Sequence, residues 1–233
     1  MLFFKKIKRF LQRNKYFLMK FNYFRFHYCK LRWLFKKKSV KVFQAQHDAT
    51  GDRTVIHNLN AFDDNAVFGM SGRMGLLIYP VVAYYRNVLD ANILIVGCRT
   101  EDDLFWLKGY GYKNVQGYDL ISYSDDVILG DFHQCQLADN SYDVVMLGWM
   151  ITYTKNPELI FSEAKRILKS GGLLCVGLDH CHRAIRQQGD SPAANELNSA
   201  ADLVALANAE VVFFHEHDYS HGDNCAVVFR ITK

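Results

Sequence analysis

One stretch decides the fold: Ile93-Leu-Ile-Val-Gly97-Cys-Arg-Thr-Glu-Asp-Asp-Leu-Phe-Trp-Leu-Lys-Gly109-Tyr-Gly-Tyr-Lys-Asn-Val-Gln-Gly-Tyr-Asp119. Its first four residues are apolar and mostly β-branched, which is typical of a strand buried on both faces of a parallel sheet. A turn at Gly97, a helix up to Gly109 and a second strand over 115–118 follow. Asp119 comes 22 residues after Gly97, the spacing at which a dinucleotide-binding βαβ unit places a carboxylate on ribose hydroxyls.

The turn after the first strand keeps only part of the glycine pattern that binds nucleotides. Gly97 holds the first position of G-x-G-x-x-G, while Arg99 and Asp102 stand in the other two. Glu101, Asp102 and Asp103 open the helix, where carboxylates stabilise the helix dipole but would repel a pyrophosphate. A cofactor with a ribose and a positive charge but no phosphate suits this turn, and S-adenosylmethionine fits that description.

The composition is that of one globular domain with an appendage. The chain has 233 residues, of which 50% are hydrophobic, and this is ample for a single core. Its six cysteines follow no regular spacing, which favours reduced thiols and a cytoplasmic protein. Charges interrupt the apolar runs near the start, so the sequence predicts neither a spanning helix nor a secretory signal. Peripheral contact with the inner face of the membrane is left open.

The first 43 residues carry a charge pattern of their own. They hold 14 lysines or arginines and no acid, whereas the other 190 residues hold 14 basic and 24 acidic side chains. Residues 1–38 fit one amphipathic helix, with room for one break. Its stripe runs in steps of three and four and is apolar except at Asn14: Phe3, Ile7, Phe10, Asn14, Phe17, Phe21, Phe24, Tyr28, Leu31 and Phe35. Such a helix suits the surface of an anionic membrane. Packing of the stripe on the protein's own body or on a second copy is the alternative, and nucleic acid is disfavoured because no module for it follows.

The rest of the chain alternates strands and helices. We expect a basic helical segment over 1–43, a connector over 44–69 and one domain over 70–233. Further strands are predicted at 127–130, 142–147, 173–178, 211–214 and 226–231, the last two as an antiparallel hairpin. Helices are predicted in the second half of 71–87, from Asn156-Pro157 to Gly171-Gly172, and near 194–207. The fold class is therefore a doubly wound, Rossmann-like α/β sheet of seven strands, mostly parallel, plus the N-terminal amphipathic helix.

From Ile93 to Gly177 the sequence resembles the class I S-adenosylmethionine-dependent methyltransferases of the compact small-molecule type, with a degenerate glycine motif. The segments that carry the resemblance are Ile-Leu-Ile-Val-Gly97, Gly-Tyr-Asp119, Gly-Asp131-Phe-His, Ala-Asp-Asn-Ser-Tyr-Asp-Val-Val-Met-Leu-Gly148-Trp, and Pro157-Glu-Leu-Ile-Phe-Ser-Glu-Ala-Lys-Arg-Ile-Leu-Lys-Ser-Gly-Gly172. Their order is more specific than any single segment, and the predicted terminal hairpin matches the end of that fold.

The resemblance implies a role for each matching position. Gly97 would let the backbone approach the cofactor, Asp119 would hold the ribose hydroxyls, Asp131 would accept from the adenine amino group, Phe132 would flank the ring, and Gly148 and Trp149 would close on the sulfonium side. This chain departs from the family at Arg99 and Glu101, where glycine is usual. We expect Arg99 to pair with the methionine carboxylate of the cofactor instead.

The expected function is S-adenosylmethionine-dependent methyl transfer to a small molecule, a lipid-linked intermediate or a glycan. The sulfonium is already activated, so the protein supplies mainly orientation, and no catalytic residue is assigned. Tyr153 and His180 are candidates for a base if the acceptor must lose a proton. A catalytically inactive methyltransferase-like binding or regulatory protein is the alternative. An NAD-dependent oxidoreductase is disfavoured by the acids at 101–103.

Two clusters of histidines contain residue types that bind metals. His180 and His182 follow the fifth predicted strand, while His215 and His217 could share one face of the sixth. Neither cluster matches a known zinc spacing, so no metal is assigned.

Overall fold

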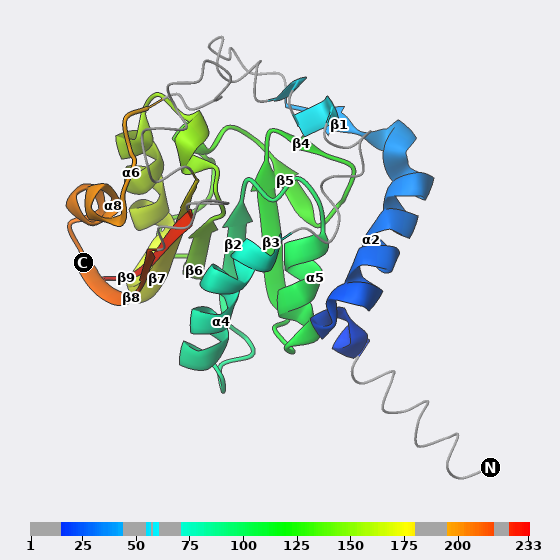
Figure 1. Cartoon of the computed structure of the whole chain (residues 1–233), viewed down its shortest axis with the longest axis horizontal. Coiled ribbons are helices and arrows are strands. Elements are labelled where there is room, and N and C mark those ends of the chain that lie inside the picture. The colour runs from blue at the N-terminus through cyan, green and yellow to red at the C-terminus, as the bar shows by residue number, and fades with distance from the viewer. Residues whose placement is uncertain (1–14, 44–54, 57, 61–70, 180–194, 217–223) are drawn as a thin grey trace.

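The computed structural model describes residues 15–43, 55, 56, 58–60, 71–179, 195–216 and 224–233 (Figure 1). A seven-stranded sheet in the order β5-β3-β2-β6-β7-β9-β8 forms its centre. The strands are β2 (Asn92–Val96), β3 (Asn114–Asp119), β5 (Val127–Leu129), β6 (Tyr142–Leu147), β7 (Leu168–Asp179), β8 (Glu210–Glu216) and β9 (Asn224–Ile231). Neighbouring strands pair in parallel except where β9 runs antiparallel to β7 and to β8. The predicted fold class, including the terminal antiparallel pair, is confirmed.

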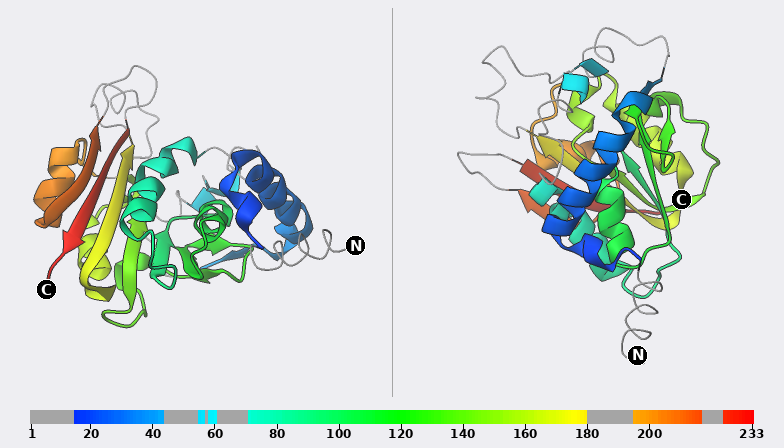
Figure 2. Two further views of the ribbon diagram at one scale, coloured as in Figure 1. Left: turned by 90° about the horizontal axis from the view of Figure 1, so that it is seen from below. Right: turned by 90° about the vertical axis from the view of Figure 1, so that its right-hand side faces the viewer.

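The central strands are apolar on both faces because helices cover the sheet on both sides. Residues 93–96 of β2 and 144–147 of β6 are almost completely buried. α4 (Gly75–Tyr84) and α5 (Asp102–Gly109) cover one face, and α6 (Pro157–Ile167) and α8 (Ala200–Ala207) cover the other (Figures 1 and 2). This arrangement explains why the strands read as continuous apolar runs rather than alternating ones.

α6 shows how local sequence sets an element and where the prediction was wrong. Pro157 occupies its first turn, and Ile160, Phe161, Ala164 and Ile167 form its buried side. The helix ends at Ile167, four residues before the predicted glycine stop, because β7 already begins at the next residue. Gly171 lies within β7 at φ 81°, a conformation that favours glycine.

The described part of the N-terminal segment is attached to the domain. A 3₁₀ turn, η1 (Phe17–Lys20), precedes α2 (Asn22–Lys36), and the extended residue Phe21 separates the two, so the predicted helix is interrupted there. α2 packs on the outer side of α5, at the edge of the molecule (Figure 1). After a second turn, η2 (Lys37–Ser39), the short strand β1 (Lys41–Val42) pairs antiparallel with β4 (Ile121–Ser122).

The buried side of α2 is not the predicted apolar stripe. Arg25, Cys29 and Trp33 face the domain, whereas Phe24 and Phe35 of the stripe are exposed. The alternative, that this stripe packs on the protein's own body, therefore does not hold for these two residues or for Leu31, which is also exposed. The physical reason is that two arginines of α2 find buried carboxylates on α5 and the turn before it.

Two further expectations concern cysteines and membrane spans. Five cysteines, Cys29, Cys98, Cys135, Cys175 and Cys225, are buried and free, as predicted, while Cys181 lies outside the described residues. Within the part of the chain that the structure describes, no helix combines the length and the hydropathy needed to cross a membrane.

Candidate functional site

A cavity of about 300 Å³ opens at the carboxyl ends of the central strands. It lies where β2 has β3 on one side and β6 on the other, the point at which the strand order reverses and where such sheets bind ligands. All seven residues predicted to contact the cofactor line it: Gly97, Arg99, Asp119, Asp131, Phe132, Gly148 and Trp149. The fold thus brings together residues that are up to 52 positions apart in the sequence.

Gly97 is required at its position for two reasons. Its φ is 74°, in the left-handed region, and a Cβ placed there would lie 2.7 Å from the Cβ of Met150. Its amide donates to the carbonyl of Tyr118 at 2.9 Å, which fixes the turn against β3. A bare backbone therefore faces the cavity at the end of β2, as the glycine pattern predicts.

Arg99 keeps the backbone shape of a glycine without being one. Its φ is 51°, a left-handed conformation that costs a non-glycine residue about 1–2 kcal/mol. Its amide donates to Oδ2 of Asp119 at 2.7 Å. The second glycine of the pattern is missing from the sequence, but the loop still follows a left-handed path there and is tied to β3.

Asp119 is positioned by the backbone around it. Its Oδ2 accepts the amide of Arg99, and its Oδ1 accepts the amide of Ile121 at 3.2 Å. Burial raises the pKa of Asp119 above its ordinary value, while these amide donors act in the opposite direction. A buried carboxylate held by fixed donors at the cavity wall presents acceptor oxygens with little freedom to reorient.

Asp131 is oriented by His133, a residue that carries no predicted role. Oδ1 of Asp131 accepts the backbone amide of His133 at 2.9 Å and lies 2.6 Å from its Nδ1. Nε2 of His133 lies 2.5 Å from Oγ1 of Thr154. A histidine two residues after an aspartate that follows a strand is a weak signal. It does not reveal the distant threonine with which His133 makes its other contact.

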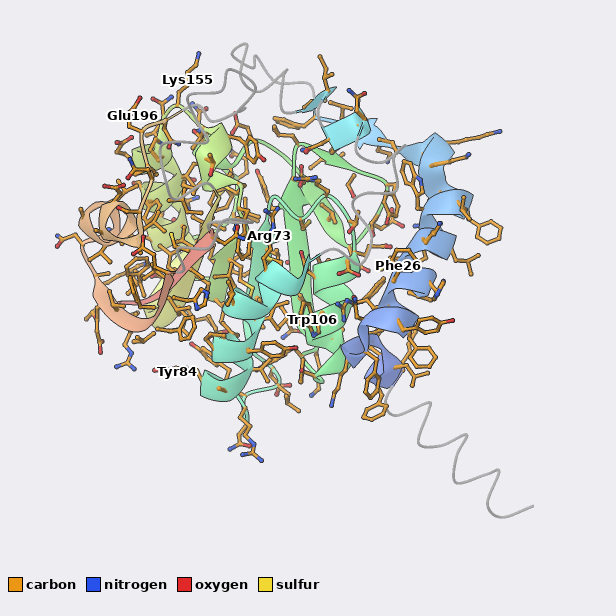
Figure 3. All side chains as sticks on the ribbon, in the orientation of Figure 1. Phe26, Arg73, Tyr84, Trp106, Lys155 and Glu196 are labelled. Atoms are coloured by element: carbon orange, nitrogen blue, oxygen red, sulfur yellow. The ribbon has the colours of Figure 1, made fainter. Side chains whose placement is uncertain are left out.

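The two aromatic residues of the cavity are held by different means. Phe132 is buried and meets the ring of Tyr118 edge-on, with centroids 5.4 Å apart. Trp149 has a left-handed backbone at φ 57°, and its indole N–H donates to Oδ1 of Asn224 at 3.0 Å. The guanidinium of Arg73 lies 5.0 Å from its ring centroid, and Figure 3 shows Arg73 at the upper end of α4.

The indole of Trp149 lies against β7. A Cβ at Gly177 would lie 2.8 Å from this ring. Glycine at this position is therefore needed to let Trp149 pack, a role that the sequence does not reveal.

Two of the acids at the start of α5, Glu101 and Asp102, bond with arginines of α2 and do not line the cavity. Glu101 is completely buried and accepts two bonds from Arg32 of α2, at 2.6 Å and 2.5 Å, and one from the hydroxyl of Ser124. Oδ1 of Asp102 accepts Nε of Arg25 at 3.1 Å. The argument that these carboxylates would repel a pyrophosphate is weakened, because arginines from α2 pair with two of them, although the cofactor it favoured is supported by the comparisons below.

Two further residues reach the cavity. Tyr153, predicted as a candidate base, lines it at the end of η5 (Ile151–Tyr153), while the other candidate, His180, lies outside the described residues. Asn58 also lines the cavity and is buried. It comes from the predicted connector, whose polar composition gives no signal for a site residue.

Metal binding receives no support from the residues described. Among them, no group of three or more histidine, cysteine, aspartate or glutamate side chains could hold a metal ion. His215 lies on β8, but His180, His182 and His217 lie outside the described ranges.

Comparison with known proteins agrees with this geometry. Residues 94–176 match the family described as "Methyltransferase domain". No curated protein is significantly similar in sequence. The matched segment runs from β2 to β7 and contains all seven predicted cofactor residues.

Solved structures share the fold at low sequence identity. The 1,6-didemethyltoxoflavin-N1-methyltransferase of Burkholderia thailandensis, solved with its substrate and S-adenosylhomocysteine, is 12% identical with a TM-score of 0.60, over 83% of this chain and 95% of that one. A SAM-dependent methyltransferase of Methanosarcina mazei is 15% identical with a TM-score of 0.51, over 66% and 98%. The [4+2]-cyclase SpnF is 15% identical with a TM-score of 0.56, over 82% and 99%.

The match of residues 94–176 to the methyltransferase domain family, the strand order and the position of the cavity support a class I S-adenosylmethionine-dependent methyltransferase. The cofactor of that class is S-adenosylmethionine. The site has the features that this cofactor needs, namely a glycine turn without room for a Cβ at Gly97 and a buried carboxylate at Asp119.

Proposed function

We propose that the protein transfers a methyl group from S-adenosylmethionine to a small acceptor. The observation that supports this most directly is the convergence of seven predicted cofactor residues on one cavity at the switch point of the sheet. The cofactor supplies an activated methyl group, so the protein needs to bind, orient and exclude water. The acceptor is a small molecule, a lipid-linked intermediate or a glycan.

The residues of the cavity take complementary parts in this proposal. Asp119 accepts from the ribose hydroxyls with oxygens that backbone amides hold in place. Asp131, oriented by His133, accepts from the adenine amino group. Arg99 pairs its guanidinium with the methionine carboxylate, an interaction of two charged groups in a half-buried site.

The remaining predicted residues shape the walls. Phe132 flanks the adenine, and Gly148 and Trp149 close the sulfonium side. Tyr153 is the candidate base in the described part of the chain, for an acceptor that must lose a proton. We also propose that residues 70–233 form the methyltransferase domain, with 44–69 as connector and 1–43 as a basic amphipathic helical segment, whose described part packs on α5.

Calorimetric titration of S-adenosylmethionine and S-adenosylhomocysteine tests the cofactor site. We expect the wild type to bind both and Asp119→Ala to lose at least about tenfold in affinity, because a hydrogen bond to a charged group contributes about 1.5–3 kcal/mol. Asp90→Ala is the matched control, since Asp90 is an exposed aspartate outside the cavity. Equal affinities of wild type and Asp119→Ala, with both folded, would refute the assignment.

A catalytically inactive binding or regulatory protein is the second candidate. Arg99 and Glu101 replace glycines that the family usually has, and this favours a changed use of the cavity. One structural neighbour is a [4+2]-cyclase, so the fold is not restricted to methyl transfer. A well-folded wild type that binds neither ligand would support this candidate.

An NAD-dependent oxidoreductase is the weakest alternative. The sequence argued against it because the acids at 101–103 would repel the pyrophosphate of NAD. This argument is weaker in the structure, since Arg25 and Arg32 pair with two of these acids. The family match now carries the objection instead.

Peripheral membrane contact through residues 1–38 is a separate proposal. It concerns the face of α2 that points away from the domain and the lysines that follow α2, while residues 1–14 lie outside the described part of the chain.

A further inference from the structure

α2 exposes an apolar surface on the side opposite its contact with α5. We call it the outer face, and it consists of Tyr23, Phe24, Leu31, Leu34 and Phe35, which are 69%, 46%, 51%, 52% and 81% exposed. Aromatic rings project outward from α2 in Figure 3, away from the body of the protein. Contiguous exposed apolar side chains of this kind mark an interaction surface.

The rotation of α2 about its axis is fixed, so this exposure is built into the packing. Arg25 is buried and bonds Asp102, the carbonyl of Met19 at 2.9 Å and Oδ1 of Asn22 at 3.2 Å. Its guanidinium also lies 4.2 Å from the ring centroid of Trp106. Turning the aromatic residues inward would remove these partners and leave buried charges unpaired.

The charge around the outer face indicates what it meets. Residues 1–43 contain 14 lysines or arginines and no acid. Lys37 and Lys38 directly follow α2, Lys41 begins β1, and all three are exposed. The exposed Asp125, which pairs with Lys36 at 3.4 Å, is an acid beside α2. An apolar helix face on a segment whose own charges are all positive still complements the interface of an anionic bilayer, where rings enter the acyl boundary and lysines meet phosphate groups.

A second copy of the chain fits the outer face less well than an anionic membrane does. A symmetric contact through α2 would bring together two segments that carry only positive charge, and like charges oppose such a pairing.

We propose that α2 docks the protein on an anionic membrane surface through its outer face. Tyr23, Phe24, Leu31, Leu34 and Phe35 insert at the interface, and Lys37, Lys38 and Lys41 contact lipid phosphates. This docking does not depend on the cofactor site, so each proposal can fail without the other.

Vesicle flotation with the full chain tests the proposal. Vesicles of phosphatidylcholine alone are compared with vesicles that also contain phosphatidylglycerol. We expect the wild type to bind the anionic vesicles and to release at high salt. The triple variant Phe24→Ser, Leu31→Ser, Phe35→Ser should lose about tenfold or more in partitioning, since membrane binding scales with inserted apolar area.

Two further variants sharpen the test. Phe214→Ser is the matched control, because Phe214 is 53% exposed on β8, at the other edge of the sheet, and its loss should leave binding unchanged. Lys37→Glu with Lys38→Glu alters exposed residues outside α2 and should reduce binding to anionic vesicles. This variant keeps the test valid if the triple variant does not fold.

Three outcomes would overturn the proposal. A folded wild type that binds neither vesicle would do so. Equal binding by the wild type and a folded triple variant would assign the contact to residues outside the outer face. A wild-type dimer that the triple variant converts to a monomer in light scattering, without vesicle binding, would identify the outer face as a contact between copies.

Discussion

Replacing Arg32 by methionine tests the buried contact that joins α2 to the domain. Glu101 has no exposed side-chain surface and takes two of its bonds from Arg32, the third coming from Ser124. Arg32→Met leaves this carboxylate buried, with the hydroxyl of Ser124 still donating to it. Breaking a buried pair by removing one partner costs about 3–5 kcal/mol. Because the side chain of Arg32 is 29% exposed, water can reach the site that it vacates. We therefore expect Arg32→Met to lower the free energy of unfolding by about 3 kcal/mol, the lower end of this range.

Urea denaturation followed by circular dichroism measures this loss. Lys113→Met is the matched control, since Lys113 and its partner Asp90 are 69% and 77% exposed, and a surface pair contributes about 0–1 kcal/mol. The double variant Arg32→Met with Glu101→Gln removes the orphaned charge and should recover part of the stability. A loss for Arg32→Met no larger than that of Lys113→Met would refute the reasoning, because it would show that Glu101 is solvated without Arg32.

Three other predictions concern the loop and wall of the cavity. Gly97→Ala should abolish cofactor binding in the calorimeter. Gly171→Ala is its control, because Gly171 also has a positive φ but no atom lies within 4 Å of an added Cβ. This control should cost only about 1–2 kcal/mol of backbone strain and leave binding intact. His133→Ala should lower cofactor affinity about tenfold by releasing Asp131, whereas His133→Asn, which keeps a short donor, should lose less. Arg99→Ala and Arg99→Gly should weaken S-adenosylhomocysteine binding alike if the guanidinium holds the carboxylate, and unchanged affinity in Arg99→Ala would contradict this role.

The α/β sheet and the composition of the cavity wall could be read from the sequence because both depend on local patterns. Residues 93–96 are a short apolar run between a loop and a glycine. In an α/β domain such a run is typical of a buried strand. Strands that run in parallel end at one edge, so the residues that follow Val96, Tyr118 and Leu147 had to meet there. Gly97, Asp119 and Gly148 were predictable for that reason.

His133 and Asn58 could not be assigned in the same way. His133 acts through Thr154, 21 residues later, and Asn58 reaches the cavity from a segment without periodicity. Contacts between single polar residues at long separation leave no repeating pattern, so nothing in the sequence distinguishes them from ordinary surface residues.

The sequence by itself determined the order of strands and helices, the glycine turn and the uniform positive charge of the first 43 residues. Only the tertiary structure decided which side of α2 is buried. Amphipathic periodicity favours burial of the phenylalanines, because removing apolar surface from water is the usual driving force. Here Arg25 and Arg32 find Asp102 and Glu101, which are 77 and 69 residues away along the chain. Buried charges must be paired, and meeting that requirement turns the phenylalanines of α2 outward.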